Sequence, residues 1–213
     1  MKKQRQLCTG CGCLAAFLVW TVMVSRIGVQ AIGPEGSSVG LATLNGWFHR
    51  LTGVHMTLYT ITDWLSLIPL FFVAGFACLG LTQWIQRKSI WKVDRSILAL
   101  GVFYLAVMAV FLFFEVYVVN YRPVLIDRVL EASYPSSTTL LVLCVMPTAM
   151  GQLHSRMKKC VLRHFAMGML CAFTVFMVAA RLISGVHWLT DIVGGLLLSA
   201  GLVLLYAVFS GLE

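Results

Sequence analysis

Six apolar segments divide the 213-residue chain, and most are close to the length of a helix that crosses a bilayer. Only 11% of the residues are charged, against roughly a quarter in soluble domains, so an ordinary soluble globule is excluded. No repeat or low-complexity linker separates the segments. The sequence predicts one all-α domain over residues 1–213, an integral-membrane bundle of six helices. The expected spans are 13–32, 56–85, 97–119, 138–153, 165–183 and 188–209.

The basic residues indicate how this bundle is oriented. The net charge is +8, but the basic residues do not form one patch of the size that a nucleic acid needs, so no nucleic-acid partner is expected. Loops rich in Lys and Arg lie in the cytoplasm, which places both termini there. The cytoplasmic set consists of Lys2, Lys3, Arg5, Arg87, Lys88, Lys92, Arg95, Arg156, Lys158, Lys159 and Arg163. The remaining basic residues, among them Arg122 and Arg181, belong to the outer side.

An ionisable cluster stands near the end of the chain, where the sequence is otherwise apolar. It consists of Arg181, His187 and Asp191. Charged groups within membrane segments are costly and therefore indicate function. His187 and Asp191 are four residues apart and would share one face of a helix, so the carboxylate can hold one imidazole nitrogen while the other faces outward. A nucleophilic histidine is oriented in this way.

The expected outer loops converge on the same cluster. They cover residues 33–55, read as a partly helical flap on the membrane, 120–137, and a turn at 184–185. In a compact bundle these loops bring Arg122, Ser136, Arg181 and His187 to one mouth. Two guanidiniums and the N-termini of helices are suitable donors for phosphate oxygens, so we expect a phosphate site there.

These residues resemble the type 2 phosphatidic acid phosphatase family, relatives of the vanadium haloperoxidases. That family carries Lys-x6-Arg-Pro, then Pro-Ser-(Gly/Ser)-His, then Ser-Arg-x5-His-x3-Asp. The matching blocks here are Arg122-Pro123, Pro135-Ser136-Ser137 and Arg181-x5-His187-x3-Asp191, so the resemblance covers the chain from about Glu115 onward. It implies an outward-facing site in which His187 forms a phosphohistidine and Asp191 orients its ring. Arg122, Ser136, Ser137 and Arg181 would hold the transferring phosphoryl group.

Three positions depart from the family pattern. The lysine position holds Glu115, the histidine of the second block is Thr138, and the serine of the third block is Ala180. In the family the histidine protonates the leaving oxygen, which threonine cannot do near neutral pH. Glu115 cannot bind phosphate while ionised, and we expect it to pair with an arginine, because it would share a helical face with Arg122 if the helix continued.

Two functions follow from these departures. In the first, the protein is a lipid phosphatase whose substrate needs little protonation of its leaving group, such as a polyprenyl diphosphate. His49, His55 or a protonated Glu115 are then possible substitute acids. In the second, the site is degenerate and the protein binds or moves anionic lipids without hydrolysing them.

The remaining expectations concern location and partners. The sequence predicts no metal site and no cofactor, because no suitable cluster of His, Cys or carboxylates lies on the outer side. The partners are the bilayer and a lipid phosphate or diphosphate, and the oligomeric state is not indicated. Short loops and small size suit a bacterial plasma membrane. Asp63, an acidic residue within the second apolar segment, is expected to be a structural partner of another residue.

Overall fold

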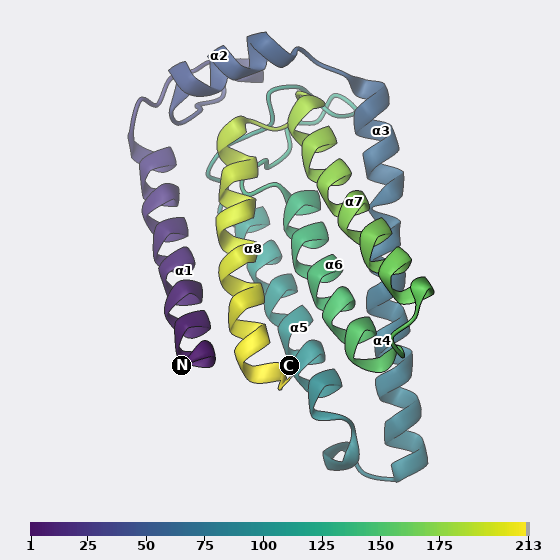
Figure 1. Cartoon of the computed structure of the whole chain (residues 1–213). Coiled ribbons are helices and arrows are strands. Elements are labelled where there is room, and N and C mark those ends of the chain that lie inside the picture. The colour runs from purple at the N-terminus through teal and green to yellow at the C-terminus, as the bar shows by residue number, and fades with distance from the viewer. Residues whose placement is uncertain (212–213) are drawn as a thin grey trace.

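The computed structural model describes residues 1–211, and its regular structure in this range is helical apart from isolated β-bridges. The predicted all-α class is therefore confirmed. Figure 1 shows the long helices side by side, with α2 lying across one end of the bundle and the start of α1 and the end of α8 at the other end. The α-helices are α1 (Lys2–Arg26), α2 (Ala42–Thr52), α3 (Met56–Leu65), α4 (Leu67–Arg87), α5 (Arg95–Val116), α6 (Ser137–Arg156), α7 (Val161–Ile183) and α8 (Leu189–Ser210). Short 3-10 turns occur at Pro34–Gly36 and Ile90–Lys92.

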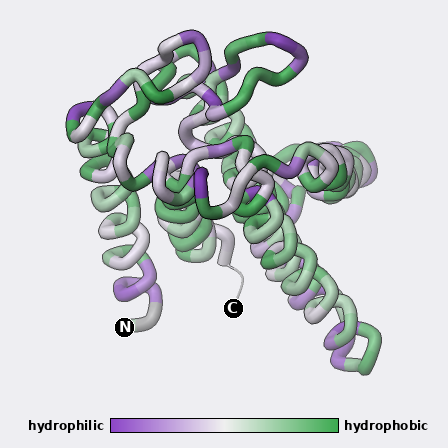
Figure 2. Tube along the Cα trace, turned by 90° about the horizontal axis from the view of Figure 1, so that it is seen from above, coloured by the Kyte–Doolittle hydropathy of each residue, from purple (hydrophilic) through white to green (hydrophobic). Residues whose placement is uncertain are grey.

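Five helical segments among the described residues are long and apolar enough to cross a membrane. They are α1, α3 with α4, α5, α7 and α8. Hydrophobic residues follow the helices in Figure 2, while hydrophilic residues gather at helix ends and in loops. The remaining long helix, α6, is more polar, and it contacts α4, α5, α7 and α8. A helix surrounded by other helices meets protein rather than lipid, so it does not need a continuous apolar surface.

Several predicted span boundaries were wrong. The first helix covers Lys2–Arg26 instead of 13–32, because Ile27 is extended and Gly28 has a φ of +57°. The second span is divided into α3 and α4 at Ser66. Pro69 contributes to this break, since it has no N–H to donate to the carbonyl of Leu65. The third span ends at Val116, before the expected 119, because Tyr117 leaves the helical conformation.

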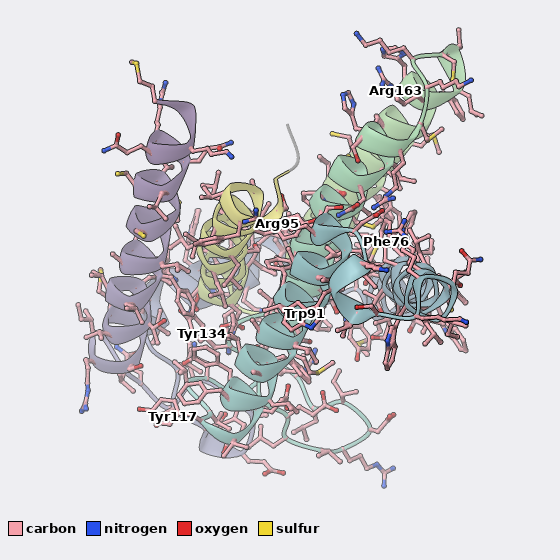
Figure 3. All side chains as sticks on the ribbon, turned by 90° about the horizontal axis from the view of Figure 1, so that it is seen from below. Phe76, Trp91, Arg95, Tyr117, Tyr134 and Arg163 are labelled. Atoms are coloured by element: carbon pink, nitrogen blue, oxygen red, sulfur yellow. The ribbon has the colours of Figure 1, made fainter. Side chains whose placement is uncertain are left out.

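The loop between α5 and α6 is fixed to the bundle by Tyr134. Its ring stacks on Phe17 of α1 at a centroid distance of 6.2 Å and meets Phe114 of α5 edge-on at 5.8 Å. Its hydroxyl lies 2.7 Å from the Thr21 hydroxyl. Tyr134 faces the α1 side of the bundle in Figure 3. A Cβ at Gly194 would lie 2.7 Å from the Tyr134 ring, so glycine is needed there for the loop to approach α8.

The flap over 33–55 is partly helical, as predicted, since it contains α2. It packs on the turn between α7 and α8. The N–H of His55 donates to the Ser184 carbonyl at 2.9 Å. A Cβ at Gly185 would lie 1.9 Å from the Gly53 carbonyl oxygen, and Gly185 also has a φ of +69°, so both space and backbone conformation require glycine. This contact brings the start of α3 next to the ionisable cluster.

Candidate functional site

His187 lies in the turn before α8, which begins at Leu189. The expectation that it shares a helical face with Asp191 was therefore wrong. Asp191 is in the first turn of α8, where its Oδ2 accepts a hydrogen bond from the Trp188 N–H at 2.9 Å. His187 Nδ1 and Asp191 Oδ2 are 3.8 Å apart, which is too long for a direct hydrogen bond. The two residues are close but need a link.

Ser133 provides that link, although it belongs to none of the three motif blocks. Its hydroxyl lies 3.1 Å from His187 Nδ1 and donates a short hydrogen bond to Asp191 Oδ2. All three side chains are buried. Ser133 belongs to the loop held by Tyr134, and it reaches the histidine only because this loop folds against the start of α8.

Arg122 determines which nitrogen of His187 is available. Its Nη1 lies 3.3 Å from His187 Nε2, and because a guanidinium can only donate, Nε2 must accept. The proton of the neutral ring is then on Nδ1, where it is donated to Ser133. Burial lowers the pKa of His187 to about 4, and the positive charge of Arg122 also lowers it, while Asp191 opposes the shift. At neutral pH the ring is neutral, with the lone pair of Nε2 facing Arg122.

Arg122 is itself held by the loop that carries it. Its backbone N–H donates to the Glu131 carbonyl at 3.1 Å, and its Nε lies 3.0 Å from the carboxylate of the same residue. The expected pairing of Arg122 with Glu115 was wrong, because α5 ends at Val116 and the helix does not continue to Arg122. Glu131 is the carboxylate beside Arg122, and Glu115 is exposed at the end of α5.

Arg181 is among the most buried large side chains, with 2% of its surface exposed. Its Nη2 donates to Thr138 Oγ1 at 2.6 Å and to Asp63 Oδ1 at 3.2 Å, while its Nη1 donates to Thr62 Oγ1 at 3.1 Å. Its Nε is buried without a hydrogen-bond partner among the described residues. The contact with Asp63 agrees with the structural partner role expected for that residue.

Tyr59 of α3 places the two arginines next to each other. The Arg181 guanidinium carbon lies 4.6 Å from the centre of the Tyr59 ring, and that of Arg122 lies 5.8 Å from it. A cation attracted to an aromatic face is stabilised by about 0.5–2 kcal/mol, depending on burial. The ring therefore offsets part of the repulsion between two guanidiniums of like charge.

The start of α6 completes this group. Ser136 is its N-cap, and the Ser136 hydroxyl accepts a hydrogen bond from the Thr139 N–H at 3.4 Å. Ser136 is buried, and its N–H donates to the Asp191 carbonyl at 3.2 Å. The first turn of a helix carries N–H groups without intrahelical partners and the positive end of the helix dipole. Ser137 and Thr138 are in this first turn, so the helix end adds positive potential beside Arg181.

These groups meet a cavity of about 870 Å³ between α4, α5 and α6. At one end it is lined by Asp63, Arg122, Ser137, Thr138 and Arg181. The rest of the lining is mainly apolar and continues to the far end of α4 and the start of α5; it includes Phe76, labelled in Figure 3, and also Trp84, Val93, Ile97 and Leu98. α4 has 21 residues and is about 30 Å long at 1.5 Å per residue, close to the thickness of a bilayer core. The polar end of the cavity thus opens into an apolar channel of membrane length.

Comparison of the whole structure with solved structures finds a similar fold. A transmembrane PAP2-type phosphatidylglycerolphosphate phosphatase from Bacillus subtilis superimposes with a TM-score of 0.55, at 17% sequence identity, over 93% of each chain. The chain has the fold of the PAP2-type membrane phosphatases. The sequence itself matches no protein-family model and no curated protein. The resemblance indicated by the three motif blocks is thus confirmed at the level of the fold.

Within this PAP2-type fold, residues of all three motif blocks come together. Arg122 contacts His187, the Ser136 N–H donates to the Asp191 carbonyl, and Arg181 contacts Thr138. Thr138, where the PAP2 pattern has histidine, lines the cavity with its hydroxyl engaged by Arg181. The three blocks, which are separated along the sequence, therefore meet at one place in the bundle.

The three suggested substitute acids lie away from the cavity. Glu115 lines a small separate pocket with Ser133 and Ser137, and it is not among the residues of the large cavity. His49 packs on the Trp188 ring at 5.4 Å, and burial lowers its pKa, which disfavours the protonated form. His55 is exposed, and its ring contacts the Thr52 carbonyl at 2.9 Å. None of the three contacts Arg122, Arg181 or His187 through a hydrogen bond or ion pair within the described range.

Proposed function

We propose that this protein is a membrane lipid phosphatase that works through a phosphohistidine on His187. The main support is that His187, a neutral and oriented histidine, contacts Arg122. Arg122 and the neighbouring Arg181 line the polar end of a membrane-length cavity. His187 Nε2 would attack the phosphorus while Ser133 and Asp191 hold the Nδ1 proton. Arg122, Arg181 and the first turn of α6 would stabilise the charge of the phosphoryl oxygens, which is the main requirement of phosphoryl transfer.

The shape of the cavity supports a lipid substrate. A phosphate group at Arg122 and Arg181 would leave the attached chain in the apolar part, which extends to Trp84 and Val93. A small water-soluble phosphate ester would gain nothing from this lining. Apolar area removed from water stabilises binding by roughly 25 cal/mol per Å², so a long chain would contribute a large share of the affinity.

We propose a polyprenyl diphosphate as the substrate class. The described residues of the cavity include no histidine, and Thr138 cannot protonate a leaving oxygen. When a diphosphate is cleaved, the leaving group is a phosphate monoester with a second pKa near 6, which is a stable anion without an acid. A phosphate monoester lipid must instead release an alkoxide. The lack of an acid therefore favours diphosphates.

We place the site on the outer face of a plasma membrane, in a single six-span domain with both termini cytoplasmic, and we propose a bacterial source. The basic loops before α5 and before α7 lie at the same end as the start of α1 and the end of α8 in Figure 1. The ionisable cluster lies at the opposite end. The positive-inside rule then assigns the cluster to the outside.

The test compares substrates and variants of the purified protein in detergent. We expect phosphate release from undecaprenyl diphosphate to exceed release from phosphatidic acid by about 100-fold or more, in line with the value of a positioned acid. Label from the terminal phosphate should be trapped on the wild-type protein and not on His187→Gln, and vanadate should inhibit. Equal rates on both lipids would overturn the diphosphate assignment. No release from any lipid phosphate would favour a protein that binds or moves anionic lipids.

A further inference from the structure

A carboxylate stands at the polar end of the cavity and has no place in the motif blocks. Asp63 of α3 lines the cavity together with Arg122, Thr138 and Arg181, and it is the only carboxylic acid among the described lining residues. Its Oδ1 accepts from Arg181 Nη2 at 3.2 Å. The same nitrogen donates to Thr138 Oγ1 at 2.6 Å. Asp63 is therefore beside Thr138, the position where the second block of the PAP2 pattern has its histidine.

Asp63 also differs from Arg181 in how far its side chain is exposed. The Asp63 side chain is 57% exposed, against 2% for the Arg181 side chain to which it is paired. Its Oδ2 has no hydrogen-bond partner among residues 1–211, so this oxygen can accept a proton or a hydrogen bond from a water molecule. This oxygen lies at the polar end of the cavity, beside Arg181 and Thr138, where a water molecule attacking a bound phosphoryl group could pass a proton to it.

We propose that Asp63 is the general base of the second half of the reaction, the hydrolysis of the phosphohistidine. This inference rests on the proposed function of His187. Asp63 Oδ2 takes a proton from water as the water oxygen bonds to phosphorus. The bond between phosphorus and His187 Nε2 breaks, its electron pair returns to Nε2, and inorganic phosphate leaves. The ring keeps its Nδ1 proton at Ser133, and Asp63 then returns its proton to solvent.

This assignment accounts for both steps of the reaction without a histidine at position 138. Cleavage of a diphosphate needs no acid, and hydrolysis of the intermediate needs a base, which the carboxylate group of Asp63 supplies. The chain can thus complete both steps with Thr138 at the histidine position. Asp63 contacts Arg181, whereas His187 contacts Arg122. The base and the nucleophile are therefore held by two different arginines.

The experiment separates formation of the phosphohistidine from its breakdown. Wild-type protein, Asp63→Asn and Asp94→Asn are mixed with undecaprenyl diphosphate labelled in its terminal phosphate, and labelled protein and free phosphate are followed in one turnover. Asp94→Asn is the matched control, because Asp94 is also an aspartate paired with arginine, but it lies at the other end of the bundle and does not line the cavity. We expect breakdown to slow about 100-fold in Asp63→Asn, so that labelled protein accumulates, and to be unchanged in Asp94→Asn. Asp63→Glu should restore part of the breakdown rate.

Two results would overturn the inference, and they are distinguishable from failure of the proposed function. If Asp63→Asn slows formation and breakdown equally, Asp63 only positions Arg181. If Asp63→Asn breaks down the intermediate at the wild-type rate, Asp63 has no part in hydrolysis. If the wild-type protein releases phosphate without ever carrying label, the phosphohistidine mechanism itself fails. Thermal unfolding of each variant identifies a folding defect, and Asp63→Glu, which keeps the charge, then carries the test.

Discussion

Two charged clusters lie at opposite ends of the bundle, and they differ in what surrounds them. The site cluster consists of Arg122, Ser133, Arg181, His187 and Asp191. The Asp94 cluster consists of Gln83, Arg87, Asp94, Gln152 and Arg156. In the Asp94 cluster the carboxylate lies 2.9 Å from Arg87 Nη1 and 3.1 Å from Arg156 Nη1, with all three side chains 31–42% exposed. In the site cluster the side chains of Arg181 and His187 are 2% and 1% exposed.

The difference in burial supports the function that we propose for the site cluster. Exposed ion pairs lose little hydration when they form, and each contributes about 0–1 kcal/mol. The Asp94 cluster needs no explanation beyond joining the ends of α4, α5 and α6. Burying two guanidiniums beside a neutral histidine costs several kcal/mol in hydration, and the carboxylates paired with them are 40% and 57% exposed. That cost is reasonable when the arginines serve an anionic ligand in the adjoining cavity.

The largest contrast is expected between Arg181→Ala and Arg156→Ala. Arg181→Ala removes a buried guanidinium from the polar end of the cavity, and we expect phosphatase activity to fall about 10²- to 10³-fold, the usual loss for one preorganised donor to a developing charge. Arg156→Ala removes an exposed partner of Asp94, and activity should stay within about twofold. Steady-state phosphate release from undecaprenyl diphosphate measures both. Equal losses would show that the two clusters do not differ in function.

The next effect concerns the link between His187 and Asp191. Ser133→Ala leaves the ring nitrogen 3.8 Å from the carboxylate with nothing between them. A hydrogen bond to a charged group contributes about 1.5–3 kcal/mol, so kcat should fall about 10- to 100-fold while KM changes little. Ser133→Thr keeps the hydroxyl and should retain more activity. A change confined to KM would indicate that Ser133 shapes the cavity and does not orient the ring.

Part of this arrangement could be predicted from the sequence. Arg122, Ser136, Arg181 and His187 were expected at one mouth because their loops are consecutive on one side of a bundle, and the structure brings them together. Ser133, Tyr59 and Glu131 were missed, since their contacts depend on how the loop after α5 and the start of α3 fold over the cluster. No periodicity in the sequence carries that information.

The errors have the same origin. Glu115 was expected beside Arg122 on the assumption of a continuing helix, and the end of α5 at Val116 removes the basis for that pairing. Helix ends depend on local backbone conformation and on tertiary contacts that hydropathy does not describe. The helix expected at 138–153 is present as α6, but its central position among the other helices could not be predicted from hydropathy.

A smaller effect distinguishes the clusters by pH. Burial places the pKa of His187 at about 4, below its ordinary value of 6.5, so the neutral nucleophile persists as the pH is lowered from 7 to 5. We expect protonation of His187 to leave kcat/KM for undecaprenyl diphosphate unaffected between pH 7 and pH 5. Below about pH 4 it should lower kcat/KM about tenfold per pH unit. Ser133 contacts the ring of His187, so the part of the pH profile that changes in Ser133→Ala is the part that reports protonation of His187. A His187-dependent decline centred near 6.5 would contradict the buried, neutral ring.

The smallest effect is expected for Asp94→Asn, which tests the structural role of the other cluster. The hydrogen bond from Gln83 and the partners Arg87 and Arg156 lower the pKa of Asp94 to about 2, from an ordinary value of 3.8. Its stabilising contribution is therefore fully present above pH 3.8 and is lost as the pH falls through about 2. Near pH 7, Asp94→Asn should lower the unfolding free energy by about 1 kcal/mol or less and leave activity unchanged. The difference in melting temperature between the variant and the wild type should shrink as the pH falls toward and below 2, since Asp94 then loses its charge. A pH-independent difference would mean that Asp94 acts through its shape alone, and a loss of activity at unchanged stability would connect the two ends of the bundle functionally.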